Sequence, residues 1–172
     1  VNVIDIKNAG PSNARNLGIK HAKGDYILFV DSDDYMEHNA LKLINEKICN
    51  NNFPNLLVFS SNVFNTDEVP GWLESSLTSR NIIRSGEDCF ASLFEESSAV
   101  PFITNKVYKT SFIKSNNILF PTNIKLGEDS AFLHKVFASL DIAYFFSDVI
   151  YNYGWQRQDS LMLKQSSVRQ IA

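Results

Sequence analysis

The chain has little of what marks several common classes of protein. Its two cysteines, Cys49 and Cys89, stand far apart without C-x-x-C spacing, which favours a reducing compartment with both as small buried hydrophobes. No stretch approaches the roughly 18 apolar residues that a membrane span requires. The opening residues, VNVIDIKN, lack the basic segment and apolar run of a signal peptide. These residues therefore predict neither a membrane span nor a secretion signal.

Positive charge is also scarce. The 16 Lys and Arg residues are outnumbered by 19 Asp and Glu residues, which gives a net charge of -3. A nucleic-acid-binding domain normally presents a basic face, so we expect no nucleic-acid partner. Aromatic residues are abundant by contrast, and 13 Phe with 6 Tyr predict a sizeable core. The length of 172 residues suits one domain.

The first part of the chain alternates between strand and helix patterns. Strands are indicated by β-branched alternation or by continuous apolar runs such as DYILFV, and helices by apolar residues at helical spacing. The predicted elements are a strand at 1–6, a helix at 8–24, a strand at 25–30, a helix at 36–50 and a strand at 55–64. This order predicts an α/β domain with a parallel sheet.

The rest of the chain is less regular. Residues 65–86 show turn residues and weak periodicity. Further elements are predicted as helices at 86–97 and 128–140 and as strands at 142–146 and 149–155. No internal repeat or linker is found in the sequence. One domain is therefore expected, with a Rossmann-like first half and an irregular second half.

Clustered carboxylates follow the strand predicted at 25–30. The sequence there is Asp31, Ser32, Asp33 and Asp34, and ligands bind at the carboxyl ends of strands in an open parallel sheet. In an extended segment Asp31 and Asp33 face the same side, about 7 Å apart. That arrangement suits a Mg²⁺ or Mn²⁺ ion whose remaining ligands come from substrate phosphates. Two alternatives stay open: Asp34 could cap the next helix, and phosphorelay receivers or hydrolases also place Asp at strand ends.

Three motifs give the chain a family resemblance. NAGPSNARNLGIKHAKGDYILFVDSDDYM (8–36) resembles the motif core of the family 2 glycosyltransferases, in which N-x-G-x-S-x-A-R-N-x-G-I precedes a strand that ends in D-S-D-D. LGEDSAF (126–132) resembles the G-E-D motif of the family. YNYGWQRQDSLM (151–162) resembles its Y-x-Y…R-x-x-S-I-M segment, although Trp155 stands where many relatives have Arg. The resemblance covers nearly the whole chain.

The resemblance implies a Rossmann-like GT-A fold with a mixed, mainly parallel sheet. Residues 1–64 would form the donor- and metal-binding half, and residues 65–172 the half with the acceptor site and catalytic base. Family members begin with further strands and helices that cradle the nucleobase, whereas this sequence begins at what resembles their third strand. The resemblance therefore implies an N-terminally truncated fragment that is weakly active or inactive in isolation. Its exposed sheet edge could support self-association.

The implied activity is that of an inverting, metal-dependent glycosyltransferase. A sugar would pass from a nucleotide-diphosphate sugar, expected to be a UDP-sugar, to the hydroxyl of a saccharide or lipid-linked acceptor. The product class would be a polysaccharide or glycoconjugate of the cell envelope. The expected location is cytoplasmic, with peripheral contact at the inner membrane face left open. The donor sugar, acceptor and linkage are not predicted.

Residue roles follow from the matched motifs. The resemblance makes Asp33 the principal ligand of Mn²⁺ or Mg²⁺ and places Asp31 near the metal and the nucleotide ribose. It makes Asp129 the general base with Glu128 in support. Without the resemblance, the pair at 128–129 would be read as charges that compensate the dipole of a helix start.

Other motif residues are assigned to the donor site. The resemblance places Asn8, Gly10 and Arg15 against the nucleotide diphosphate, and Arg157 with Ser160 in a loop that covers it and excludes water. Arg15 could instead be a surface residue, and the segment with Arg157 and Ser160 a polar tail. A non-catalytic relic or assembly module of the same fold is the alternative function, and the intact carboxylate motifs argue against it.

Overall fold

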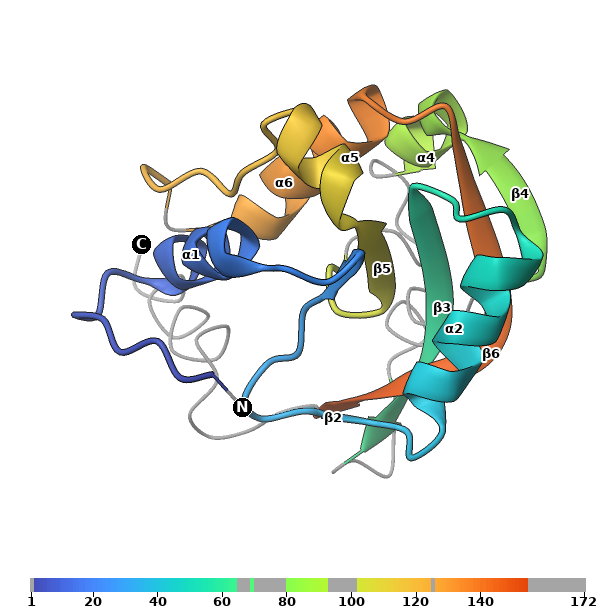
Figure 1. Ribbon diagram of the computed structural model, residues 1–172, viewed down its shortest axis with the longest axis horizontal. Coiled ribbons are helices and arrows are strands. Elements are labelled where there is room, and N and C mark those ends of the chain that lie inside the picture. Colours follow the sequence, from blue (N-terminus) through green and yellow to red (C-terminus); the bar gives the residue numbers. More distant parts are fainter. Residues whose placement is uncertain (1, 65–68, 70–79, 93–101, 125, 155–172) are drawn as a thin grey trace.

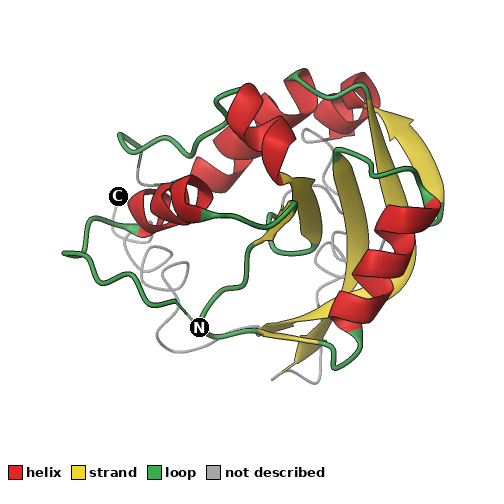
Figure 2. Cartoon of the chain, in the orientation of Figure 1, coloured by secondary structure: helices red, strands yellow, loops and turns green. Residues whose placement is uncertain are grey.

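A computed structural model describes residues 2–64, 69, 80–92, 102–124 and 126–154 of the chain. Helices lie against both faces of a curled sheet in this part of the protein (Figures 1 and 2). The elements in chain order are α1 (Pro11–His21), β1 (Tyr26–Leu28), β2 (Tyr35–Met36), α2 (Ala40–Asn50), β3 (Leu56–Phe64), β4 (Ile82–Ser85), α4 (Gly86–Ser92), β5 (Lys106–Lys109), α5 (Thr110–Ser115), α6 (Glu128–Ala138) and β6 (Ile142–Gly154).

The sheet is mixed, as predicted, but not mainly parallel. Its strand order is β1-β5-β3-β6-β2, and β4 also pairs with β6. In the described part of the chain β3 and β6 run parallel, whereas the other four pairings are antiparallel. The sequence prediction assumed that successive strands are parallel neighbours. The alternation of strands and helices does not reveal that β5, from far downstream, inserts between β1 and β3.

Residues 2–6, predicted as a strand, form no ladder in the structure. They are exposed, and Val3 retains 86% of its accessible surface. Apolar alternation alone does not make a strand, because each strand needs a hydrogen-bonding neighbour. β1 consequently stands at the end of the strand order, beside a groove of about 470 Å³ whose lining includes Ala14, Gly18 and residues 26–30. Self-association through this edge stays a prediction.

β6 combines two predicted strands into one long element. Its first part pairs with β4 and its last part with β2, while β3 runs beside it throughout. The register of the β3–β6 ladder shifts between Val58 and Ser61, close to the point where the partner of β6 on its other edge changes from β4 to β2. β6 therefore extends from the end of α6 to the acidic segment at 31–34.

Two apolar cores hold the layers together. One lies under α4, α5 and α6 and is rich in aromatic rings, among which Phe120 and Phe132 stack at 4.0 Å between ring centroids. The other lies under α2, whose Ala40, Ile44 and Ile48 recur at helical spacing and face β3 and β6. Cys89 is buried as predicted, but Cys49 lies on the outer side of α2 and is exposed. The described part of the chain contains no helix that could span a membrane.

Candidate active site

The acidic segment after β1 is a tight turn. The backbone N–H of Asp34 donates to the carbonyl oxygen of Asp31 at 3.1 Å, so the expectation of an extended segment with alternating side chains is wrong. A turn forms because the chain must reverse from β1 into β2, which pairs with β6 rather than continuing the first strand. The Asp31 side chain is 40% exposed, and Asp33 is also exposed.

Asp34 does not cap the following helix. α2 begins at Ala40 with Asn39 before it, because Tyr35 and Met36 are used in β2. The two carboxylate oxygens of Asp34 instead accept bonds from the Gly154 backbone N–H at 2.9 Å and the Tyr151 hydroxyl at 2.7 Å. Burial raises the pKa of Asp34, and these two hydrogen bonds partly oppose that shift. Asp34 is thus bound by protein groups through both oxygens.

The entry to α1 is shaped by Asn8 and Gly10. The Asn8 side-chain oxygen accepts from the Gly10 backbone N–H at 3.1 Å, and Gly10 has a φ of 86°, in the region that favours glycine. Pro11 occupies the first helical turn, as predicted. Asn16 then fixes the helix, because its amide makes two 2.8 Å bonds with the backbone of Phe120. Asn16 thus joins α1 to the segment at Phe120, and contact of Asn8 or Gly10 with a nucleotide stays a prediction.

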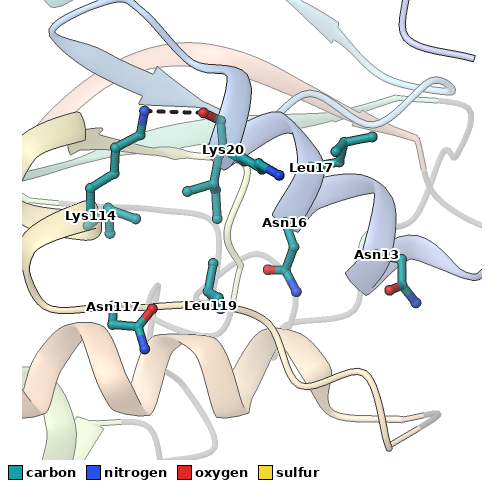
Figure 3. A pocket seen from close by; sticks show the side chains of 9 residues that line it. Asn13, Asn16, Leu17, Lys20, Lys114, Asn117 and Leu119 are labelled. Carbon is teal, nitrogen blue, oxygen red and sulfur yellow. Dashed lines mark hydrogen bonds between the residues drawn. The ribbon is translucent and has the colours of Figure 1, made fainter.

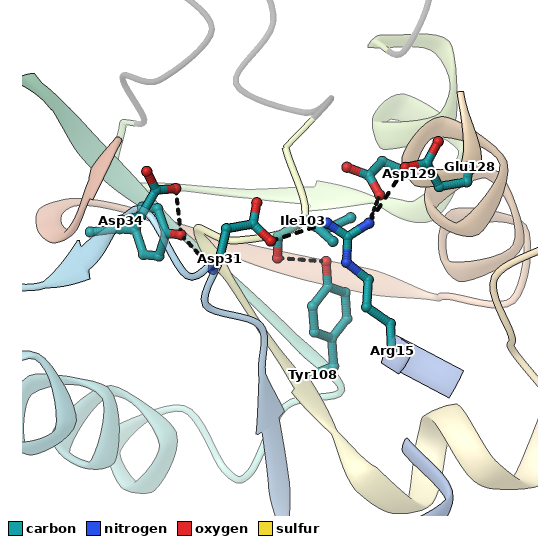
Figure 4. Close-up of polar contacts among 8 residues, drawn as sticks. Arg15, Asp31, Asp34, Ile103, Tyr108, Glu128 and Asp129 are labelled. Carbon is teal, nitrogen blue, oxygen red and sulfur yellow. Dashed lines mark hydrogen bonds and ion pairs between the residues drawn. The ribbon is translucent and has the colours of Figure 1, made fainter. Parts of the chain in front are cut away.

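Arg15 connects the two predicted carboxylate sites (Figure 4). Its Nη1 donates to Asp129 Oδ1 at 2.6 Å and lies 3.6 Å from Glu128 Oε1, while Nη2 donates to Asp31 Oδ1 at 3.1 Å. The guanidinium group lies over the Phe120 ring, 5.4 Å from its centroid, and the side chain is only 15% exposed. Arg15 is therefore no free surface residue, because it links groups from α1, the acidic turn and α6.

Glu128 and Asp129 occupy the first turn of α6, as predicted. Gly127 precedes them with a φ of 81°, so the backbone turns sharply into the helix. Burial raises the pKa of Asp129 to about 6, since the favourable field of Arg15 is outweighed by desolvation together with the charges of Glu128 and Asp31. A carboxyl group with this pKa is ionised at neutral pH and suited to accept a proton. The position also compensates the helix dipole, so the two roles are compatible.

The carboxylates of the acidic turn could hold a divalent ion only together with other ligands. One oxygen of Asp31 is occupied by Arg15, but the other makes no hydrogen bond among the described residues, nor does the Asp33 carboxylate. The same residues contain no group of three or more His, Cys, Asp or Glu side chains that could hold a metal alone. Mg²⁺ typically uses one or two carboxylates plus substrate phosphates. The residues present therefore fit a metal site that a diphosphate completes.

Two further polar groups near Asp129 were missed by sequence reasoning. Lys106 on β5 is fully buried, donates to Asn105 Oδ1 at 2.8 Å and to the Phe102 carbonyl, and has its pKa lowered by burial to about 7. Tyr108 is buried beside Arg15 and donates to the Ile103 carbonyl at 3.1 Å (Figure 4). The sequence NKVY gives no sign that this lysine is buried, although a lysine is rarely fully buried without a specific reason.

A separate pocket of about 530 Å³ lies between α1 and α5 (Figure 3). Its lining includes Asn13, Leu17 and Lys20, which share a face of α1, and Lys114 from α5. Lys114 Nζ donates to the Lys20 and Ala22 carbonyl oxygens at 3.4 and 2.7 Å. The lining does not include Arg15 or its partners Asp31, Glu128 and Asp129, which together are called the Arg15 cluster.

Three residues discussed from the sequence lie outside the described part of the chain. They are Arg157 and Ser160, assigned by resemblance to a loop over the diphosphate, and the departing residue Trp155. Their assignment is therefore unchanged by the structure.

Comparison with known proteins shows the family of the chain. The family model described as glycosyl transferase family 2 matches residues 1–112, and the chain belongs to that family. In the crystal structure of Staphylococcus aureus TarS 1–349 in complex with UDP-GlcNAc, the matching region has a TM-score of 0.68 and 27% identity over 93% of this chain and 43% of that one. The likeness confirms the GT-A fold.

Curated relatives are much longer than this chain. Poly(ribitol-phosphate) beta-N-acetylglucosaminyltransferase TarS of Staphylococcus aureus is 27% identical over 94% of this chain but 26% of its own length. An uncharacterised glycosyltransferase of Rickettsia bellii is 39% identical over 72% of this chain and 16% of its own. The poly(ribitol-phosphate) beta-glucosyltransferase of Bacillus spizizenii is 29% identical over 82% and 22%. The chain thus spans about a quarter of TarS.

Proposed function

We propose that this chain is the catalytic region of a glycosyltransferase that moves a sugar from a nucleotide-diphosphate sugar to an acceptor hydroxyl during cell-wall polysaccharide synthesis. The observation that carries the proposal is the Arg15 cluster, in which one guanidinium group joins Asp31 of the acidic turn to Asp129 of α6. Family membership and the names of the relatives support the reaction class. The UDP-GlcNAc complex of TarS supports a UDP-sugar as donor.

The two parts of the chain divide the work in this proposal. Residues 1–64 bind the donor, with Asn8, Gly10, Arg15 and Asp31 beside the diphosphate and ribose. Residues 65–172 supply the acceptor site and the base, and Arg157 with Ser160 cover the diphosphate. The acceptor is a saccharide or a polyol phosphate, carried on a lipid or a growing polymer. We place the reaction in the cytoplasm, at the membrane face if the acceptor is lipid-linked.

The reaction is a single displacement with inversion at the anomeric carbon. The acceptor oxygen bonds to that carbon, the bond from the carbon to the diphosphate oxygen breaks, and the hydroxyl proton passes to Asp129. Asp129 is ionised at neutral pH with a pKa of about 6, which suits a general base. Glu128 lies within the same first turn of α6 and reinforces the negative field that holds Arg15. Asp33 and Asp31 would hold Mn²⁺ or Mg²⁺, which stabilises the charge on the departing diphosphate when bound.

Arg15 has two sets of partners in this mechanism. Its 2.6 Å bond to Asp129 keeps that carboxylate ionised and oriented before the substrates bind. An incoming diphosphate offers a more strongly charged acceptor to the same guanidinium group, which suits bidentate recognition of phosphate. Arg15 therefore binds the donor at the point where it meets the base.

The test is a donor screen with the intact protein that contains this region. A panel of UDP-, GDP-, dTDP- and CMP-sugars is incubated with Mn²⁺ or Mg²⁺ and a polyol-phosphate or saccharide acceptor, and the released nucleotide is quantified. Release that depends on one donor and on the acceptor is the expected result. Absence of release, together with a melting temperature unchanged by every nucleotide and metal, would favour the non-catalytic alternative.

A further inference from the structure

The acidic turn is fastened to β6 by a tyrosine to which no role has been given. The hydroxyl of Tyr151 accepts a bond from the Asp31 backbone N–H at 3.1 Å and donates to Asp34 Oδ2 at 2.7 Å. One hydroxyl group therefore contacts both ends of the turn. Tyr151 is 1% exposed and belongs to the core under α2, so its ring has little freedom to move.

Backbone contacts extend the same attachment. Asp34 Oδ1 accepts from the Gly154 N–H at 2.9 Å, and the ladder that follows pairs Tyr35 with Asn152 and Met36 with Tyr151. A Cβ added to Gly154 would lie 3.4 Å from both Asp33 O and Asp34 Oδ1, which shows how closely β6 approaches the turn. The end of β6 thus holds the turn through side-chain and main-chain bonds together.

These contacts separate the roles of the three carboxylates. Both carboxylate oxygens of Asp34 accept hydrogen bonds from protein donors. One oxygen of Asp31 accepts from Arg15, and the Asp33 carboxylate makes no hydrogen bond among the described residues. Asp34 therefore anchors the turn, whereas Asp31 keeps one carboxylate oxygen and Asp33 keeps both oxygens without a partner among the described residues. The precision of their placement depends on the backbone of the turn, which Tyr151 contacts directly.

We propose that Tyr151 is a positioning residue that fixes the acidic turn on β6 and thereby orients Asp31 and Asp33 for the donor diphosphate. The attachment itself is independent of the reaction, and only its effect on donor binding rests on the proposed function. Phenylalanine at this position would keep the ring in the core and lose both hydrogen bonds. The turn would then be held by the bond between Asp34 and Gly154 and by the ladder that follows it.

The test compares Tyr151→Phe with Tyr153→Phe in the intact protein. Tyr153 lies on the same strand and is half-buried, and its hydroxyl makes no hydrogen bond to another described residue. Removal of the Tyr153 hydroxyl is therefore the matched control. Amide hydrogen exchange of the ligand-free protein is measured first. Tyr151→Phe should speed exchange of the Asp31 N–H about tenfold, as expected for the loss of a protecting hydrogen bond, and Tyr153→Phe should not.

Donor binding is measured next by steady-state kinetics and by calorimetry with UDP and Mn²⁺. Tyr151→Phe should raise the donor KM and the UDP Kd about tenfold while kcat changes by less than about threefold, because positioning is lost before chemistry. Asp34→Asn should show the same pattern and add little to Tyr151→Phe in the double variant, because both changes disrupt the hydrogen bond between Tyr151 and Asp34. Asp34→Asn also serves if Tyr151→Phe fails to fold.

Two results would overturn the proposal. One is unchanged exchange at Asp31 in Tyr151→Phe and Asp34→Asn, since the turn would then be held by other contacts. The other is faster exchange with unchanged UDP affinity and donor KM, since the attachment would then serve stability alone. If the wild-type protein binds no nucleotide, the proposed function fails, and the exchange experiment still decides whether Tyr151 holds the turn.

Discussion

The acidic turn at 31–34 and the start of α6 are both carboxylate clusters at the end of an element, yet their environments differ. Asp33 is exposed and Glu128 is only 18% exposed, whereas the side chains of Asp31 and Asp129 are similarly exposed, at 40% and 36%. Burial at the start of α6 is enough to raise the pKa of Asp129 to about 6. A solvated carboxylate can ligate a cation at little desolvation cost, whereas a partly buried one exchanges protons near neutral pH. The contrast lies between the exposed Asp33 and the pair at 128–129, where Glu128 is mostly covered and the pKa of Asp129 is raised, and it supports different roles for two chemically similar clusters.

The largest effect is expected for Asp129→Asn in the intact protein. Removal of the proton acceptor should lower kcat roughly 1,000-fold, because an amide cannot act as a base, while UDP affinity stays within about twofold. Asp141→Asn, at an exposed carboxylate between α6 and β6, is the matched control and should transfer normally. Full transfer by Asp129→Asn would assign the base to another residue.

The next test is Asp33→Asn, on the exposed cluster. Loss of this charge should reduce kcat/KM for the donor roughly 100-fold and abolish the dependence of UDP binding on Mn²⁺, because a metal–diphosphate contact is removed. Calorimetry with and without Mn²⁺ measures this, with Ser32→Ala in the same turn as control. If Asp33→Asn keeps metal-dependent binding and Asp129→Asn loses it, the roles of the two clusters are reversed.

A smaller loss of activity is expected for Arg15→Gln, which removes the guanidinium group that joins the two clusters. Arg15 lowers the pKa of Asp129, so its replacement should raise that pKa above about 6. The base is active when ionised, and therefore activity falls as the pH falls through this pKa. In the wild type the acid limb of log kcat/KM, which reports the protein without substrate, should lie near pH 6, and in Arg15→Gln it should move to higher pH, with roughly a tenfold loss at neutral pH.

Lys20→Gln, on another face of α1, is the control for that experiment. It removes one positive charge from the same helix without touching the cluster. An equal shift of the acid limb in both variants would mean that Asp129 senses net charge rather than the direct contact with Arg15.

The smallest effect concerns the scaffold. Asn16→Ala removes two bonds to the backbone of Phe120, which should lower the free energy of unfolding by about 1–3 kcal/mol and leave kcat at neutral pH largely unchanged below the melting range. Asn13→Ala, whose side chain bonds only locally to the Ala9 carbonyl, is the control in a thermal melt. A fall in kcat below the melting range, beyond what the loss of folded protein explains, would show that the position of α1 controls the site.

Local sequence pattern predicted the helices better than the sheet. α1, α2 and α6 follow from apolar spacing, and Arg15, Asp31 and Asp129 from the matched motifs, which the structure brings together. Strand direction and neighbours could not be predicted, because a strand of three or four residues, such as β1 or β5, carries no information about its partner. The assumption of parallel pairing failed for that reason.

Residues defined by distant contacts were also beyond the sequence. The sequence placed Tyr151 in a motif but predicted no role for it, because its partners Asp31 and Asp34 lie about 120 positions earlier in the chain. Asp34 read as a helix cap, because capping is the nearest local use of an aspartate before a helix. Lys106 was overlooked, since nothing local distinguishes a buried lysine from one at the surface of a strand. The motifs therefore pointed to individual residues, and the tertiary contacts show which of these residues meet.

The bond from Arg15 to Asp129 spans 114 positions of the chain. Contacts of such long range form late, because the intervening residues must first be ordered. During synthesis from the N-terminus, α1 and the acidic turn would leave the ribosome well before α6 and would wait for it without a completed centre. An unfinished or misfolded chain would consequently carry the proposed donor half without the proposed base, and transfer activity would then indicate that folding has reached α6.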